Sequence, residues 1–260
     1  MLKWCSYCQQ FLGEIPDYEK LTITHGVCAA CAANALDFTE SDFKLAESLR
    51  HIQHQLHDAG RRNDLEAAEH IIENAARANI RAVDILMGII APMLYQVGED
   101  WKRGILSVAE EHRFTSFCDE IFKRVASSAK VPMPVGATEA KGPEVLLMNA
   151  PGNKHTLAIR ILTLWLWNKG LRARVIDVPP TLEDLTTQLI RTQSRLILVS
   201  MALAEQSIGV TTIVERIAEL PSSIRPRIIV GGYAVKLGLV PAIPGADFMG
   251  DISSLQDQAP

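Results

Sequence analysis

The chain has 260 residues, 48% of them apolar and 22% charged, and a formal net charge of −4 with a pI near 6.0. This length is enough for one large or two modest domains with real hydrophobic cores. A protein that binds nucleic acid through phosphate contacts should carry a basic stripe, and the sequence shows none. Composition therefore predicts a globular protein that does not bind DNA directly.

Neither a secretory leader nor a membrane span is evident from the sequence. The first residues are not followed by an apolar stretch with a cleavage site. No run reaches the roughly eighteen consecutive apolar residues that a transmembrane helix needs. We therefore expect a cytoplasmic protein without a membrane anchor.

Four of the five cysteines lie in the first 31 residues, as two Cys-x-x-Cys pairs. Nineteen residues separate the pair Cys5 and Cys8 from the pair Cys28 and Cys31. This spacing is typical of a tetrahedral zinc site closed by four thiolates. It predicts a zinc-ribbon-like module over residues 1–37, with a metal-free reduced segment or a dithiol switch as the alternative.

Two neighbouring assignments follow from the four-thiolate shell. Because four sulfurs already complete the coordination sphere, His25 is expected to be a turn residue and not a ligand. Cys118 stands alone in a helical segment, and we expect it to lie in the hydrophobic core.

Residues 40–129 show the apolar spacing of four helices that form a bundle. The first two helices share an apolar stripe at Leu45, Leu49, Ile52, Leu56, Leu65, Ala68, Ile71 and Ile72. A break at 60–63 should separate them, with Asn63 as an N-cap. The third helix, about Ile80 to Lys102, is apolar on too many faces for the surface. It should lie at the centre of the bundle and bend at Pro92, which removes a backbone donor.

The fourth helix is expected to begin at Ser107 and to end near Ala129. Ser107 and Glu110 have the spacing of a capping box, in which each side chain bonds the other residue's backbone N–H. Residues 130–143 contain three prolines and two glycines without apolar periodicity. This composition predicts a linker.

Residues 144–260 alternate short apolar runs with amphipathic stretches. The predicted strands are 144–149, 172–177, 195–201, 226–231 and 246–249. The predicted helices are 155–169, 182–192, 205–219 and 233–238. Such alternation is typical of a doubly wound, Rossmann-like parallel sheet. The expected fold class is therefore α plus α/β, with a helical bundle before the sheet.

One histidine stands where such a sheet binds ligands. His155 follows the first predicted strand of the sheet, at its carboxyl edge, and a neutral imidazole can serve as an axial ligand of a metal. Ser200 ends the third strand, and Gly231 and Gly232 end the fourth. In the helical region, Trp101 is followed after nine residues by Glu111 and His112.

Together these fragments resemble the CarH-type cobalamin-dependent photoreceptors, from about residue 40 to the end of the chain. In the cobalamin-binding loop of that family, an acid and a glycine stand where this chain has Asn153 and Ala158. The resemblance implies a Rossmann-like cobalamin-binding domain with His155 as the lower ligand of cobalt. The acid normally bonds the far nitrogen of that imidazole. Asn153 can bond but carries no charge.

The resemblance also implies how the rest of the cofactor is bound. Trp101 and Glu111, with His112 and Val108, would cover the upper face of adenosylcobalamin. Ser200, Gly231 and Gly232 would line its nucleotide tail; glycine permits close approach of the backbone to a bulky ligand.

One position departs from the light chemistry of the resembled family. The family places a histidine after the tryptophan, and that histidine binds cobalt after photolysis. Here Lys102 stands at that place, and an ammonium cannot ligate a metal unless it is deprotonated. His112 is the nearby imidazole that could substitute.

These observations predict a sensory protein and not an enzyme: a light-responsive, cobalamin-binding regulator of transcription. No DNA-binding domain precedes the bundle, so we expect it to signal through contacts with a regulatory protein partner, and a homo-oligomer is compatible with that role. The alternative is a corrinoid methyl carrier of a methyltransferase system. A structural interaction protein that has lost its corrin is a third reading.

Overall fold

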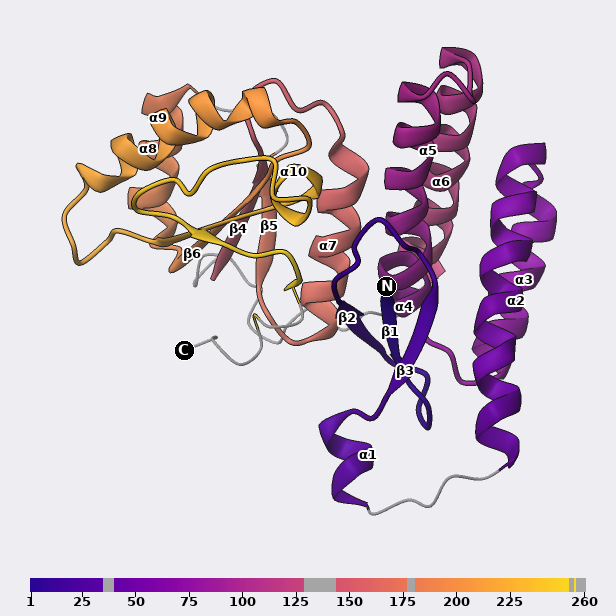
Figure 1. The fold of residues 1–260 in the computed structure, drawn as a ribbon. Helices are drawn as coiled ribbons and strands as arrows, with labels where there is room; N and C mark the ends of the chain where they lie inside the picture. The colour runs from indigo at the N-terminus through magenta and orange to yellow at the C-terminus, as the bar shows by residue number, and fades with distance from the viewer. Residues whose placement is uncertain (35–39, 129–143, 177–180, 253–254, 256–260) are drawn as a thin grey trace. The chain divides into compact units, whose positions relative to one another are not determined.

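The computed structural model describes residues 1–34, 40–128, 144–176, 181–252 and 255, and of residues 40–46 only the backbone (Figure 1). The chain divides into two compact units, Met1–Lys130 and Val131–Pro260. The predicted linker, residues 130–143, lies outside the described residues.

A small sheet that the sequence reading did not anticipate opens the first unit. Its strands are β1 (Leu2–Cys5), β2 (Phe11–Glu14) and β3 (Ile23–Gly26), and a short helix follows, α1 (Ala29–Ala33). The strand order is β2-β1-β3, with β1 antiparallel to β2 and parallel to β3. The central strand β1 therefore ends at Cys5, next to the end of β3, which leads to the second cysteine pair.

Four helical segments form the rest of the first unit, as predicted. They are α2 (Glu40–Arg62), α3 (Leu65–Arg77), a continuous third helix made of α4 (Ala82–Ile85), η1 (Leu86–Ile90) and α5 (Ala91–Lys102), and α6 (Val108–Ser128). The third helix contributes fully buried residues such as Ile85, Ile89 and Ile90, so its predicted place in the core is confirmed.

Two helix ends test the predicted caps. The capping box is confirmed: the Glu110 carboxylate accepts from the backbone N–H of Ser107 at 2.8 Å, and Glu110 N–H donates to the Ser107 hydroxyl at 3.3 Å. The N-cap prediction at Asn63 is wrong. Asp64 caps α3 by accepting from Ala67 N–H at 3.0 Å, whereas Asn63 has a φ of 54° in the turn before it. Both residues can cap, and only their backbone conformations distinguish them.

The predicted break at 60–63 is shifted as well, because α2 continues through Gly60. A Cβ at this glycine would lie 2.6 Å from Cε2 of Phe114 on α6. Gly60 therefore allows α2 and α6 to pack closely and does not end the helix.

The third helix contains a wide turn just before Pro92. Residues Leu86–Ile90 are π-helical, and Ala91 N–H donates to the carbonyl of Leu86, five residues earlier. Pro92 has no N–H, and its ring would clash with the carbonyl four residues back in a regular α-helix. A π turn changes this spacing and accommodates the proline.

The same helix, Ala82–Lys102, is long and apolar enough to cross a membrane by length and composition. Most of its apolar stretch, 61%, is buried inside the unit. This is how the central helix of a folded bundle behaves.

The second unit is the predicted parallel sheet (Figure 1). Its strands are β4 (Val145–Asn149), β5 (Ala173–Ile176), β6 (Leu196–Ser200), β7 (Arg227–Gly231) and β8 (Asp247–Phe248). Its helices are α7 (Thr156–Asn168), α8 (Leu182–Thr192), η2 (Ala204–Gln206), α9 (Ser207–Ala218) and α10 (Tyr233–Lys236). All strands run parallel, in the order β5-β4-β6-β7-β8. The predicted strands and helices of this unit are all confirmed.

Both faces of this sheet are covered, which explains its continuous apolar strands. Alternate residues such as Leu146, Met148 and Val199 share one core with α8 and α9. The residues between them point to the opposite face, on which α7 packs against β4 and β5. The chain places β5 on one side of β4 and then crosses back to place β6 on the other side. The strand order therefore reverses between β4 and β6. Ligands of open α/β sheets bind at this switch point.

Glycine at position 232 is required by the chain's own packing. Gly232 has a φ of +100°, and a Cβ there would lie 2.5 Å from the backbone oxygen of Met201. Gly231 accepts from Met201 N–H at 2.8 Å. The turn after β7 thus lies directly against the residue that follows β6, at the carboxyl edge of the sheet.

We predict that Gly232→Ala destabilises the second unit by about 1–3 kcal/mol from backbone strain alone, with further loss from the contact to Met201. The matched control is Gly238→Ala, because Gly238 also has a positive φ, +64°, but open space around its Cβ. The control should cost only about 1 kcal/mol. Urea unfolding followed by circular dichroism measures both, and equal losses would contradict the packing argument.

Candidate functional site

His155 lies at the switch point, directly before α7. It is the N-cap residue of that helix, but its side chain makes no capping hydrogen bond. The side chain is exposed, and its ring makes no hydrogen bond within the described part of the chain. Both imidazole nitrogens are therefore available to a ligand or a metal.

The loop that carries His155 is held by Asn153, whose side chain is buried (6% exposed). Its amide nitrogen donates to the backbone oxygen of Ser200 at 3.0 Å and approaches Oδ1 of Asn149 at 3.4 Å. Its amide oxygen accepts from His155 N–H at 3.0 Å. Asn153 therefore joins the ends of β4 and β6 and fixes the backbone of His155, while its amide is engaged away from the imidazole.

A second contact fixes the same loop. A Cβ on Gly209, in the first turns of α9, would lie 2.9 Å from Cγ of Pro151. The loop after β4 therefore packs directly on the start of α9. These contacts hold the backbone before His155 without any ligand.

The neighbouring loop after β6 and the first turn of α9 expose apolar side chains that were not predicted as site residues. Leu203 and Ile208 are 50% and 77% exposed. The buried side chain of Gln206 holds this loop, since its oxygen accepts from the N–H groups of Ala202 at 2.9 Å and Leu203 at 3.1 Å. We call Leu203 and Ile208 the sheet-edge patch. Only their exposure, which a sequence does not display, distinguishes them from core residues.

The predicted upper-face residues lie on adjoining helix ends of the first unit. Trp101 is in the last turn of α5, whereas Val108, Glu111 and His112 are in the first turns of α6. Gly104, with a φ of +72°, ends α5, and its N–H donates to the carbonyl of Trp101 at 2.9 Å. A glycine in this conformation is a common helix terminator.

These helix ends also expose apolar side chains. Trp101, Ile105 and Val108 are 49%, 66% and 54% exposed, and we call them the helix-end patch. Eight large apolar side chains are prominently exposed among the described residues, and five of these belong to the two patches. Exposed apolar residues that cluster are typical of binding surfaces, whereas single ones are ordinary.

The polar residues of the helix ends are partly engaged. Glu111 is mostly buried and accepts from the Thr115 hydroxyl at 2.8 Å. His112 is exposed, 3.4 Å from the same carboxylate, and Lys102 lies 3.7 Å from Glu99. Lys102 is therefore a solvated, ion-paired lysine, and the one imidazole in this group is that of His112.

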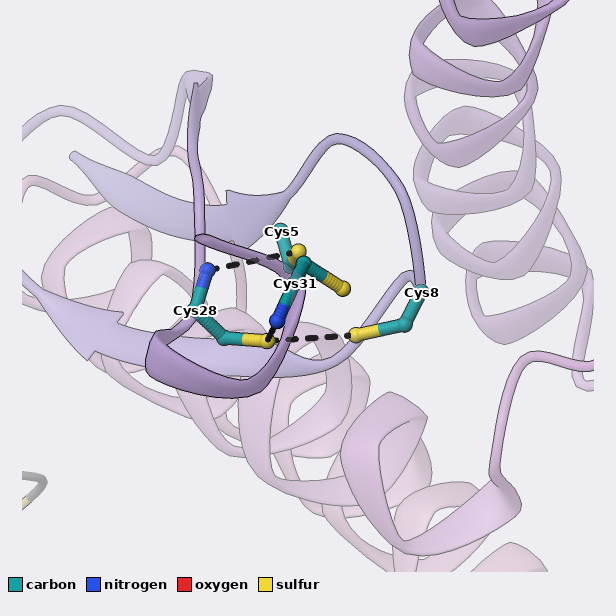
Figure 2. Close-up of side chains that lie close together, drawn as sticks. All are labelled: Cys5, Cys8, Cys28 and Cys31. Carbon is teal, nitrogen blue, oxygen red and sulfur yellow. Dashed lines mark hydrogen bonds between the residues drawn. The ribbon is translucent and has the colours of Figure 1, made fainter. Parts of the chain in front are cut away.

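The four N-terminal cysteines form a compact cluster (Figure 2). One sulfur from each residue lies within 4.8 Å of the other three. The sulfurs of Cys8 and Cys28 are 3.7 Å apart. In a tetrahedron with metal–sulfur bonds of about 2.3 Å, neighbouring sulfurs are about 3.8 Å apart. The cluster could therefore hold a metal ion with little rearrangement.

Backbone hydrogen bonds prepare this cluster for a cation. Burial raises the pKa of the Cys5 thiol, but N–H groups of Cys8, Cys28 and Tyr7 stabilise the thiolate and bring the pKa down to about 7. The Cys28 N–H lies 3.4 Å from that sulfur. A side-chain hydrogen bond with Cys28, together with burial, raises the pKa of Cys31 to about 11. Cys5 therefore ionises readily, whereas the raised pKa values of Cys8 and Cys31 mean that these thiols need a bound cation to release their protons.

His25 lies within β3, so its prediction as a turn residue is wrong. Alternation along a strand of only four residues is too short to be recognised in the sequence. Its ring nitrogens are buried without a hydrogen-bond partner among the described residues, and burial, together with Arg50, lowers its pKa. Cys118 is fully buried, as predicted, and burial raises the pKa of its thiol.

Comparison with known proteins finds one sequence match in the helical region and structures with a similar fold. The sequence profile of the B12 binding domain matches residues 52–125, from α2 to α6. No curated protein matches the chain. The structure is similar to the monomethylamine corrinoid protein of Methanosarcina barkeri, with a TM-score of 0.63 and 16% identity over 80% of this chain and 96% of that one.

Two further structures resemble the chain more distantly. One is a cobalamin-binding protein from Desulfitobacterium hafniense DCB-2, with a TM-score of 0.41 and 14% identity over 80% of this chain and 98% of that one. The other is the methanol:cobalamin methyltransferase complex MtaBC of Methanosarcina barkeri, with a TM-score of 0.35 and 14% identity over 82% and 88% of the two chains. The likeness to the monomethylamine corrinoid protein shows the fold of this chain, and features specific to CarH-type photoreceptors stay predictions.

We predict that Asn153→Asp destabilises the second unit by about 1–3 kcal/mol, because a carboxylate cannot donate to the Ser200 oxygen or to Asn149. His155→Ala is the matched control. It leaves these contacts in place and should leave stability nearly unchanged. Chemical denaturation of the two variants in the absence of ligand tests this. A loss in His155→Ala as large as that in Asn153→Asp would contradict the assignment.

Proposed function

We propose that the chain binds cobalamin, with His155 as the lower axial ligand of cobalt in place of the cofactor's own benzimidazole base. The observation that carries the proposal is the free, exposed imidazole of His155 on a loop that Asn153 fixes at the switch point. A ligand that is already oriented loses little entropy on binding. The match of the B12 binding domain profile to the other unit supports the same cofactor.

The exposed apolar residues of each unit suit contact with the apolar parts of so large a cofactor. The faces of the corrin ring and the benzimidazole base of cobalamin are apolar, and the sheet-edge patch is an exposed apolar surface on the same unit as His155. Ser200, Gly231 and Gly232 stand at the ends of β6 and β7 on the same edge, where we propose that they line the nucleotide tail. In the first unit, the helix-end patch would contact the upper face of the corrin, with Glu111 and His112 as its polar neighbours.

For the role of the bound cofactor, we propose a methyl carrier that serves a separate methyltransferase. Cobalamin supplies a cobalt–carbon bond from which an alkyl group can be transferred. The similar structure with the highest TM-score reported above is a monomethylamine corrinoid protein. Under this proposal the chain binds and presents the methyl group, and a partner enzyme catalyses its transfer. The carrier role replaces the light-responsive regulator as the leading proposal.

A light-responsive regulator of transcription is the second candidate, and the spacing of Trp101, Glu111 and His112 favours it. Adenosylcobalamin would then be the bound form, with the adenosyl group beneath Trp101, and a regulatory protein would be the partner. Lys102 is ion-paired and solvated, so His112 or water would occupy the upper position after photolysis.

For the cysteine cluster we propose one structural zinc ion. The donor set consists of four sulfurs, which zinc prefers in closed sites, and the separation of Cys8 and Cys28 fits its tetrahedral edge. A segment of this size builds only a small core of its own, so metal binding contributes directly to its folding.

His155→Ala is expected to abolish tight cobalamin binding or to leave the cofactor with its own base coordinated, because no other histidine stands in the loop after β4. Absorption spectra and equilibrium dialysis with methylcobalamin and adenosylcobalamin measure this. His70→Ala, at an exposed position on α3, is the control. A variant with the affinity and spectrum of the wild type would overturn the proposal.

Illumination of the same samples separates the two roles. A carrier should bind methylcobalamin at least as well as adenosylcobalamin and keep its assembly state in light. A photosensor should prefer adenosylcobalamin and change its spectrum and assembly on illumination, with the photoproduct altered in His112→Ala.

Metal analysis of the purified chain should give one zinc ion per molecule. Cys28→Ser should lose the metal, since a three-sulfur site is open, whereas Cys118→Ala and His25→Ala should retain it. Absence of stoichiometric zinc in the wild type, or its loss from His25→Ala alone, would contradict the four-sulfur site.

A further inference from the structure

The small sheet packs closely against the third helix at Gly88. Trp4 of β1 and Phe11 of β2 are fully or almost fully buried and pack edge to face, with ring centroids 5.4 Å apart. A Cβ on Gly88 would lie 2.5 Å from Cζ2 of Trp4 and 2.6 Å from Cδ2 of Phe11. The two rings therefore rest directly on the helix backbone. We call Trp4, Phe11 and Gly88 the ring seat.

The ring seat covers the least regular turn of the helix. Gly88 is at the centre of the π turn Leu86–Ile90, which precedes Pro92. The turn lacks the hydrogen bond that an N–H at position 92 would supply, so its order depends on packing more than that of a regular turn. Beyond it, α5 runs without interruption to Trp101.

The cysteine cluster begins at the residue that follows the ring seat in the same strand. Trp4 precedes Cys5 in β1, the central strand. A metal ion bound to the four sulfurs would join the end of β1 to the start of α1, and thereby hold β1 beside β3. One further link ties this region to the bundle: the Gln53 amide of α2 donates to the carbonyl of Leu21 at 2.8 Å.

We propose that the metal ion of the cysteine cluster positions the cofactor-binding end of the third helix through the ring seat. The proposal rests on the two proposed functions, zinc at the cysteines and cobalamin at the helix end. With metal, Trp4 and Phe11 stay on Gly88 and the π turn is ordered. Without metal, the small sheet loosens, the turn opens, and Trp101 is no longer held for the upper face of the corrin. Trp4 and Phe11 are thus positioning residues for cobalamin binding.

Gly88→Ala tests the seat, because the added methyl group displaces both rings. Gly98→Ala is the matched control: Gly98 lies on the same helix, and its Cβ would meet nothing within 4 Å. In Gly88→Ala we expect backbone amide exchange over residues 86–102 to rise about tenfold. Affinity for adenosylcobalamin should fall several-fold while one zinc ion per chain is retained. Gly98→Ala should exchange no faster than the wild type, because alanine favours a helix more than glycine does, and it should keep the wild-type affinity and zinc content.

Removal of metal from the wild type by a chelator, followed by readdition of zinc, tests the coupling itself. Faster exchange over 86–102 and weaker cobalamin binding, both reversed by zinc, are the expected results. If Gly88→Ala loses its helical circular dichroism altogether, Phe11→Leu replaces it as a milder change at the seat with the same expected effects.

The proposals fail in distinguishable ways. A wild type that binds no metal overturns the zinc site, and a metal-loaded protein that binds no cobalamin overturns the proposed cofactor. A protein that binds both overturns the coupling if metal removal leaves exchange over 86–102 and cobalamin affinity unchanged.

Discussion

The hydrogen bonds of the Asn153 amide are the interactions on which the proposed cofactor site depends. The amide is buried between the ends of two central strands, β4 and β6, where its nitrogen must donate a hydrogen bond and its oxygen must accept one. The nitrogen donates to the Ser200 carbonyl, and the oxygen accepts from the backbone of His155. An amide can do both at once, whereas an ionised carboxylate has no proton to donate. The switch point is therefore shaped by the chain's own hydrogen bonds, and the imidazole of His155 is left free.

The packing of the loops around the switch point also shapes it through the chain's own contacts. The ring of Pro151 packs on Gly209, and Gly232 lies against the backbone of Met201, so a side chain at either glycine would separate the segments that meet there. The large apolar residues of the region, Leu203 and Ile208, are correspondingly left at the surface. A sheet edge with exposed apolar side chains and one free imidazole has the composition of a binding surface for a large metal cofactor with apolar faces.

The regular elements could be predicted from the sequence because their signals are local. Apolar runs marked each strand of the sheet, and helical periodicity marked the bundle. The failures occurred where a local signal had two readings. Adjacent residues Asn63 and Asp64 both suit an N-cap, and Gly60 suits both a helix break and a close helix crossing. The strands of the first unit were not predicted because they are short and do not alternate with amphipathic helices, the pattern that marked the strands of the second unit.

The candidate site was predictable in part for the same reason. The positions of His155, Ser200 and the four cysteines follow from strand ends and spacing. The role of Asn153 does not, because its partners on β4 and β6 come together only in the folded sheet. Likewise, Gly232 was expected to make room for a ligand, whereas its closest neighbour is the backbone of Met201. Long-range contacts of this kind leave no periodic trace in a sequence.

The central claim, that His155 ligates cobalt, is tested most directly by electron paramagnetic resonance of the protein loaded with cob(II)alamin. The protein should be prepared with ¹⁵N-labelled histidine and the cofactor left unlabelled. Our account predicts that each axial cobalt line is split into a doublet by the ¹⁵N of the protein imidazole. A triplet from unlabelled nitrogen would show that the cofactor's own benzimidazole remains bound, and would contradict the account.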